Sequence, residues 1–88
     1  MRFKIVFTKT FEKSLKRLTP AEQKQVAVKL KILQTNPYHP SLRTKKIKGF
    51  DGLFECSVNM DIRILWQYKD TEIIIILDIV HHSVMDKF

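Results

Sequence analysis

The feature that most constrains the fold of this chain is a nearly continuous apolar run at residues 73–77, inside the segment 72–80. A strand that is apolar on both faces needs neighbouring strands on both edges and cover on both faces. We therefore expect segment 72–80 at the centre of a β-sheet. It delivers two histidines, His81 and His82, to one end of that sheet.

Two further strands precede this central one. Apolar and polar residues alternate along residues 53–58 and again along residues 62–68, which is the period of a half-buried strand. Glu55 and Ser57 face away from the apolar side of the first, and Arg63 faces away from that of the second. Short turns follow both segments, so the three strands are expected to be antiparallel neighbours.

The first half of the chain predicts a strand and two helices. Residues 2–7 alternate as a strand, and a short amphipathic helix follows, capped by Thr8 or Thr10. A second helix begins at residues 19–22, where a threonine, a proline and a glutamate form the pattern of a capping box, and it ends near Thr35. The joint between the helices is short, which predicts an antiparallel helical hairpin.

This order of elements predicts an α+β domain of the form β-α-α-β-β-β, with a four-stranded, mainly antiparallel sheet and the helical hairpin packed on one face. The first strand returns over a helical crossover and pairs most economically with segment 72–80. Residues 36–52 show no hydrophobic period and predict a loop or a short edge segment. The 88 residues contain no repeat or linker, so we expect one domain spanning residues 1–88.

The charge of the chain is unevenly distributed. The net charge is +7, but residues 1–48 hold 13 Lys and Arg against two acidic residues, a balance of +11, while residues 49–88 hold three against seven, a balance of −4. Such an asymmetry suits a polyanionic partner, either nucleic acid or an acidic protein. The alternative is a solvated, lysine-rich surface without a partner.

Several classes of protein and site are not expected. No apolar run is long enough to cross a membrane, and a single cysteine, Cys56 on the apolar face of its strand, agrees with a reducing compartment, so the protein is expected to be cytoplasmic and not membrane-bound. Glycine-rich phosphate loops and cysteine–histidine sets with zinc spacing are lacking. His81 and His82 are adjacent on a strand end and point in opposite directions. We therefore predict no metal and no cofactor.

Arg63 and His82, with the surrounding lysines, suit metal-free cleavage of RNA. In this reaction the ribose 2′-hydroxyl attacks its own 3′-phosphate, a base removes the hydroxyl proton, and an acid protonates the leaving 5′-oxygen. Histidine titrates near neutral pH, and arginine offers a planar fork that matches phosphate oxygens. The same residues also fit structural roles, with Arg63 in an ion pair with Asp61 or Asp78 and His82 hydrogen-bonded at a strand end.

Short motifs are distributed along the second half of the chain. They occupy residues 45–49, 53–59, 61–66, 77–82 and 86–88. Together with an opening strand that runs into a basic helical hairpin, they resemble the RelE/ParE superfamily of toxins from type II toxin–antitoxin systems. The histidine near the C-terminus is more similar to the YafQ-like ribonuclease branch. The resemblance covers essentially the whole chain.

The resemblance implies a ribosome-dependent endoribonuclease that cuts mRNA on the ribosome and is held inactive by a cognate antitoxin. By position, Arg63 matches the phosphate-stabilising arginine of the family, and His82 matches the residue that acts as acid or base. The residues that match substrate-contacting positions are Lys45, Lys46, Lys48, Asp61 and Phe88.

This chain also departs from the pattern of the family. Val80 stands where a glycine is common, Ser83 where an aspartate is common, and Met85 where an aromatic is common. These departures leave open which residue is the acid or the base, and whether the nuclease activity is weakened or lost.

Two other functions remain open on the sequence. A ParE-like inhibitor that binds DNA gyrase would share the fold and need no catalytic residues. A basic nucleic-acid-binding module would need only the positive charge of residues 1–48. For a toxin of either kind, the antitoxin is expected to present an acidic helix or strand to the basic helices or the sheet.

Overall fold

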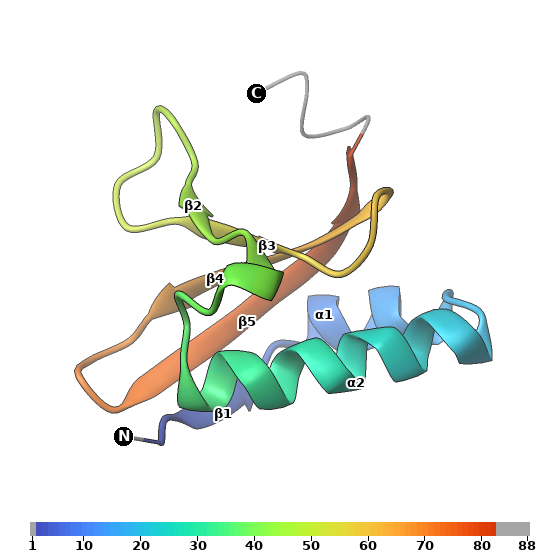
Figure 1. Cartoon of the computed structure of the whole chain (residues 1–88), viewed down its shortest axis with the longest axis horizontal. Coiled ribbons are helices and arrows are strands. Elements are labelled where there is room, and N and C mark those ends of the chain that lie inside the picture. The colour runs from blue at the N-terminus through green and yellow to red at the C-terminus, as the bar shows by residue number, and fades with distance from the viewer. Residues whose placement is uncertain (1, 83–88) are drawn as a thin grey trace.

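The computed structural model describes residues 2–82 and combines two helices with a five-stranded sheet (Figure 1). The elements in chain order are β1 (Lys4–Phe7), α1 (Lys9–Lys16), α2 (Pro20–Thr35), the 3-10 turn η1 (Pro40–Leu42), β2 (Lys45–Lys46), β3 (Phe54–Ser57), β4 (Ile62–Tyr68) and β5 (Ile73–His81). The predicted α+β class and the predicted order of helices and long strands are confirmed. Neither helix of the described part is long and apolar enough to cross a membrane.

The order of strands across the sheet is β1-β5-β4-β3-β2. β1 pairs in parallel with β5, with Lys4 opposite Ile73, as predicted. The predicted count of four strands is wrong, because Lys45 and Lys46 pair antiparallel with β3 as a fifth strand. Two residues are too few to show a hydrophobic period, so sequence reasoning could place this segment only as a loop or an edge. β5 has a neighbouring strand on both edges, as expected for segment 72–80. It is not the central strand, however, because β4 occupies the middle of the sheet.

β4 and β5 contain one irregularity in their pairing. Leu65 lies opposite Asp78 while Trp66 lies opposite Ile76, so Leu77 is an extra residue in β5. A bulge of this kind shifts the alternation of side chains by one position. The buried positions of β5 are therefore Ile74 and Ile76 before the bulge and Ile79 after it.

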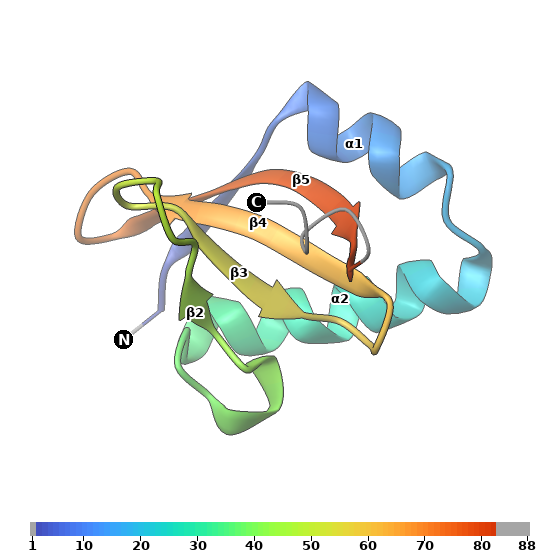
Figure 2. The same cartoon turned by 90° about the horizontal axis from the view of Figure 1, so that it is seen from above.

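β1 pairs with the first part of β5, residues 73–76, and α1 packs against the part of β5 that follows. The hydroxyl of Thr8, the N-cap of α1, accepts a hydrogen bond from the Phe11 amide at 3.1 Å and donates one to the Leu77 carbonyl at 2.8 Å. Farther along the helix, the Ser14 hydroxyl donates to Asp78 Oδ1 at 2.5 Å. α1 therefore packs against β5 beyond the end of β1 (Figure 2).

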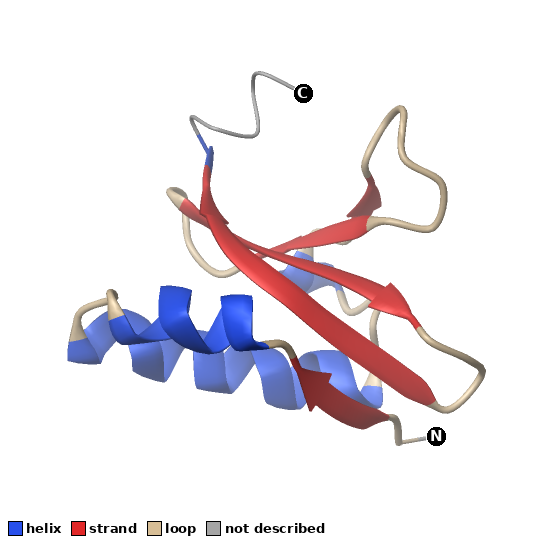
Figure 3. Cartoon of the chain, turned by 180° about the vertical axis from the view of Figure 1, so that it is seen from behind, coloured by secondary structure: helices blue, strands red, loops and turns tan. Residues whose placement is uncertain are grey.

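α2 begins with the predicted capping box. The Thr19 hydroxyl accepts from the Glu22 amide at 3.2 Å, and the Glu22 carboxylate accepts from the Thr19 amide at 2.9 Å. Val26 and Leu33 on this helix are buried. α1 and α2 run in opposite directions along one side of the sheet, which confirms the predicted helical cover (Figure 3).

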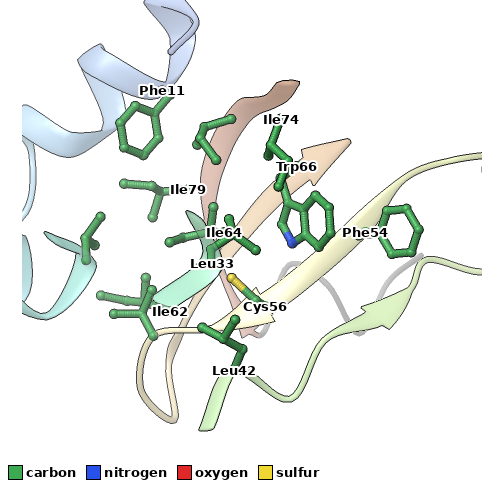
Figure 4. Close-up of a cluster of buried hydrophobic side chains, with 13 residues drawn as sticks. Phe11, Leu33, Leu42, Phe54, Cys56, Ile62, Ile64, Trp66, Ile74 and Ile79 are labelled. Carbon is green, nitrogen blue, oxygen red and sulfur yellow. The ribbon is translucent and has the colours of Figure 1, made fainter. Parts of the chain in front are cut away.

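One contiguous hydrophobic core lies between the helices and the sheet (Figure 4). Ile64 and Trp66 of β4 are fully buried in it, and Phe54 of β3 stacks on the Trp66 ring with a centroid distance of 4.7 Å. The other buried members are Phe11, Val26, Leu33, Leu42, Cys56, Val58, Ile62, Ile74, Ile76 and Ile79. This core holds the ends of β4 and β5 against α2 and η1.

Candidate nucleic-acid cleft

A cleft of about 330 Å³ lies where β4 begins and β5 ends, against α2 and η1. Its lining residues are Lys29, Ser41, Arg43, Ser57, Val58, Asn59, Met60, Arg63 and His82. Arg63 and His82, predicted as a catalytic pair, thus face a common space. Three of the lining side chains are cationic, and none of the described lining residues is acidic. The cleft is therefore suited to an anion.

Arg63 is held by the carbonyl oxygens of its own turn. Its Nη1 donates to the carbonyls of Asn59 at 2.5 Å, Met60 at 3.2 Å and Ile62 at 3.2 Å. These contacts fix one corner of the guanidinium. Within residues 2–82, Nη1 is the one nitrogen of this side chain that donates hydrogen bonds. The donors on Nη2 and Nε remain for a ligand. An ion pair of Arg63 with Asp61 or Asp78, the structural alternative, does not occur within the described part of the chain.

Asn59 organises the turn that carries Arg63. Its Oδ1 accepts from the amides of Asp61 at 2.8 Å and Ile62 at 2.9 Å, which is the pattern of an Asx turn. Its Nδ2 donates to Oε1 of Gln25 on α2 at 2.8 Å. The sequence predicted a turn here, and the structure shows that the turn is also tied to the helix.

His82 is placed by the backbone of the same turn. Its amide donates to the carbonyl of Asp61 at 2.7 Å, so the end of β5 is held beside the start of β4. His82 lines the cleft whereas His81, opposite Ile62 in the sheet, does not, as expected for adjacent residues on a strand end. Across residues 2–82, no group of three or more His, Cys, Asp and Glu side chains is arranged to hold a metal ion.

Lys29 and Arg43 form a second cationic wall that the sequence analysis did not single out. Lys29 Nζ donates to the carbonyl of Ser41 at 3.2 Å, which links α2 to η1. Arg43 follows η1 with a positive φ of 50°. Arg43 belongs to the basic segment 36–52, which the sequence predicted as a loop or edge that could bind phosphate. No sequence signal pointed to Lys29 or to the nearness of the two residues, because the cleft brings together segments that are far apart in the chain.

The predicted substrate-contacting residues are not gathered at this cleft. Lys45 pairs with Glu55 at 3.3 Å. Lys46 in the edge strand β2 and Lys48 just after it are exposed and do not line the cleft. Asp61 contributes its backbone to the placement of His82, but its exposed side chain is not among the lining groups. The remaining predicted residue, Phe88, and the departures at Ser83 and Met85 lie outside the described residues.

Glu55 is buried, with 4% of its surface exposed, although it was expected on the face of β3 away from the core. One carboxylate oxygen meets Lys45, and the other, Oε2, has no hydrogen-bond partner among residues 2–82. Cys56, next to it in the core, is fully buried, and burial raises the pKa of its thiol to about 12. A thiol of this kind is a packing residue, as its place on the apolar face predicted.

The fold is shared with toxins of known structure. The chain is similar to the archaeal RelE in its complex with RelB from Pyrococcus horikoshii OT3, with 22% identity, a TM-score of 0.78 and coverage of 94% of this chain and 98% of that one. It is similar to RelE of the RelB–RelE antitoxin–toxin complex from Methanococcus jannaschii, with 27% identity, a TM-score of 0.75 and the same coverage. The E. coli DinJ–YafQ toxin–antitoxin complex matches with 11% identity, a TM-score of 0.77 and coverage of 96% and 97%.

The sequence itself also matches a family model. That model, for the ParE toxin of the type II toxin–antitoxin system parDE, matches residues 5–85. No protein among curated sequences matches the chain. The family match spans nearly the whole chain, and the structural matches agree with it in fold. The chain therefore belongs to the ParE toxin family of type II toxin–antitoxin systems, within the RelE/ParE superfamily.

Proposed function

We propose that this toxin is a metal-independent endoribonuclease that cleaves mRNA on the ribosome. The observation that carries the proposal is the cleft in which Arg63 and His82 lie together without an acidic lining residue in the described part of the chain. An inhibitor that acts by binding alone needs no such combination of a fixed cation and a side chain that can transfer a proton.

The geometry supports a division of labour between the two residues. Arg63 presents Nη2 and Nε to the non-bridging oxygens of the scissile phosphate while its Nη1 stays on the turn carbonyls, and it stabilises the charge that develops on the phosphorane. His82 transfers a proton, either from the 2′-hydroxyl or to the leaving 5′-oxygen. The products are a 2′,3′-cyclic phosphate and a new 5′-hydroxyl end.

We further propose that a cognate antitoxin neutralises this activity. Three of the similar structures are complexes of a toxin with its antitoxin. The basic first half of the chain, with a balance of +11 over residues 1–48, suits an acidic partner segment. Masking the cleft or closing it would each prevent RNA from reaching Arg63.

A second candidate is inhibition of DNA gyrase. It is favoured by the family model that matches the chain, which is that of the ParE toxin. In this case the cleft would have no catalytic role, and substitutions in it would leave toxicity unchanged.

The test is inducible expression of the wild type, Arg63→Ala and His82→Ala in cells, with growth and mRNA 5′ ends followed on translating ribosomes. Each variant has a matched control on the surface. His81→Ala removes the neighbouring histidine that does not line the cleft, and Arg17→Ala removes an exposed arginine after α1. Ligation that requires prior phosphorylation identifies the 5′-hydroxyl ends.

The nuclease proposal predicts new 5′-hydroxyl ends inside codons for the wild type and both controls, and their loss in Arg63→Ala and His82→Ala while these variants stay folded. Growth arrest that persists in both cleft variants without any cuts would reject it. A DNA damage response in place of translation loss would then support inhibition of gyrase.

A further inference from the structure

The cleft has two cationic walls, and the proposed reaction uses only one of them. Arg63 and His82 come from β4 and from the end of β5, whereas Lys29 and Arg43 come from α2 and from the residue after η1. Arg63 and His82 are sufficient to contact a single scissile phosphate. The second wall is left with two positive charges and no acidic lining residue to neutralise them within the described chain.

The second wall is held in place by the fold. Lys29 Nζ donates to the Ser41 carbonyl at 3.2 Å, and η1 is anchored by Leu42, which is fully buried. One end of η1 is packed in the core, and its backbone is joined to α2. The Lys29 ammonium and the backbone of Arg43 are therefore preorganised and do not move freely on a loop.

Arg43 adds a second sign of constraint. Its φ of 50° lies in the left-handed region, which is uncommon for a residue other than glycine. Its amide caps η1 by donating to the Pro40 carbonyl at 3.2 Å. A glycine would adopt this backbone without strain, but the chain places a long cationic side chain at this point of the cleft.

We infer that Lys29 and Arg43 bind the phosphate next to the scissile one, so that the cleft takes two consecutive phosphates of a single RNA strand. This inference rests on the proposed function for the meaning of the scissile phosphate. The cleft volume of about 330 Å³ is at the small end of ligand pockets and suits a short piece of the chain. Contacts of this kind position RNA without reading its sequence.

The test measures RNA binding without cleavage. Oligoribonucleotides of equal sequence carry 2′-O-methyl groups that prevent attack, and neutral methylphosphonate linkages replace all but one, two or three of their phosphates. They are titrated by fluorescence anisotropy at several salt concentrations. The variants are Lys29→Gln, Arg43→Gln and the double variant. Lys31→Gln is the matched control, because Lys31 lies on α2 but lines a separate groove beside β1. Circular dichroism verifies that each variant is folded.

The expected result is a step in wild-type affinity between one and two phosphates, and its loss in the double variant. For single strands, each lost phosphate contact lowers the slope of log affinity against log salt by about 0.7. Lys29 and Arg43 share one phosphate, so the double variant should lose a slope of about 0.7, and a fourfold rise in salt weakens the wild type about 2.6-fold more than the variant. Lys31→Gln should behave as the wild type.

An unchanged salt slope in the double variant overturns the inference, because Lys29 and Arg43 are then ordinary solvated cations. The inference is also overturned if the affinity of the wild type does not depend on the number of phosphates. Lys29 and Arg43 would then be a binding surface for an acidic protein segment. The binding result is independent of cleavage. If the phosphate step is present but no mRNA is cut on ribosomes, the proposed nuclease fails and the two-phosphate site stands.

Discussion

The buried carboxylate of Glu55 provides a sharp test of the energetics of the sheet. Glu55 is 4% exposed, its Oε2 has no hydrogen-bond partner within the part of the chain that the structure describes, and its other oxygen meets the Lys45 ammonium at 3.3 Å. The Lys45 side chain is 71% exposed, so water weakens the attraction between the two charges. The contact with Lys45 therefore does not offset the cost of burying a carboxylate.

The magnitudes follow from these contacts. Replacing Glu55 with methionine removes an unsatisfied oxygen, worth about 1–3 kcal/mol, and loses an ion pair with an exposed partner, worth about 0–1 kcal/mol. Glu55→Met should raise the free energy of unfolding by about 1 kcal/mol. Lys45→Met leaves the carboxylate buried without its partner, and should lower the free energy of unfolding by up to about 1 kcal/mol. Lys46→Met, at an exposed neighbouring position, is the control.

The assay is urea unfolding at neutral pH, followed by the fluorescence of Trp66 and by circular dichroism. The double variant should be close to Glu55→Met, because Lys45 matters only while the carboxylate is present. A fall of more than about 1 kcal/mol for Glu55→Met, together with a silent Lys45→Met, would refute the reasoning. Such a result would mean that the carboxylate is well satisfied in solution.

Two further predictions concern the core and the turn. Burial raises the pKa of Cys56 to about 12, from 9.0 for a free thiol, so the folded protein retains a proton that the unfolded chain releases. The free energy of unfolding should therefore fall between pH 9 and pH 12 by up to about 1.4 kcal/mol per pH unit. Urea unfolding of Cys56→Ala should show a flatter decline over this range. An equal slope in the two proteins would contradict the raised pKa of Cys56. Asn59→Ala should lower the free energy of unfolding by about 1–3 kcal/mol, because two backbone amides lose their acceptor. Asn59→Asp keeps that acceptor and should lose clearly less in the same assay, whereas equal losses would contradict the role of the Asx turn.

The parts of the fold that follow from local patterns were predictable. The capping box at Thr19 places the start of α2, and alternation along residues 62–68 places β4 and its buried face. Both signals are encoded within a few neighbouring residues. The parallel pairing of β1 with β5 followed from the order of the elements, because a strand that returns over a helical crossover pairs in that way.

Other features depend on contacts that no local pattern contains. Glu55 was expected on the face of β3 away from the core, but it is buried and pairs with Lys45 on the short neighbouring strand. Arg63 and His82 were predicted together because neighbouring strands carry them. The nearness of Lys29 and Arg43 to Arg63 was not predicted, because it depends on how α2 and η1 pack against the sheet, which charge counts along a sequence do not reveal.

The parallel pairing of β1 with β5 also has a consequence for the synthesis of the protein. Lys4 lies opposite Ile73. The first strand to be synthesised can therefore pair only after the last strand has been synthesised. The cleft has the same dependence, because its lining runs from Lys29 to His82. Pairing over such a separation forms after local helices. A growing chain on its own ribosome therefore exposes basic helices long before it possesses an assembled cleft.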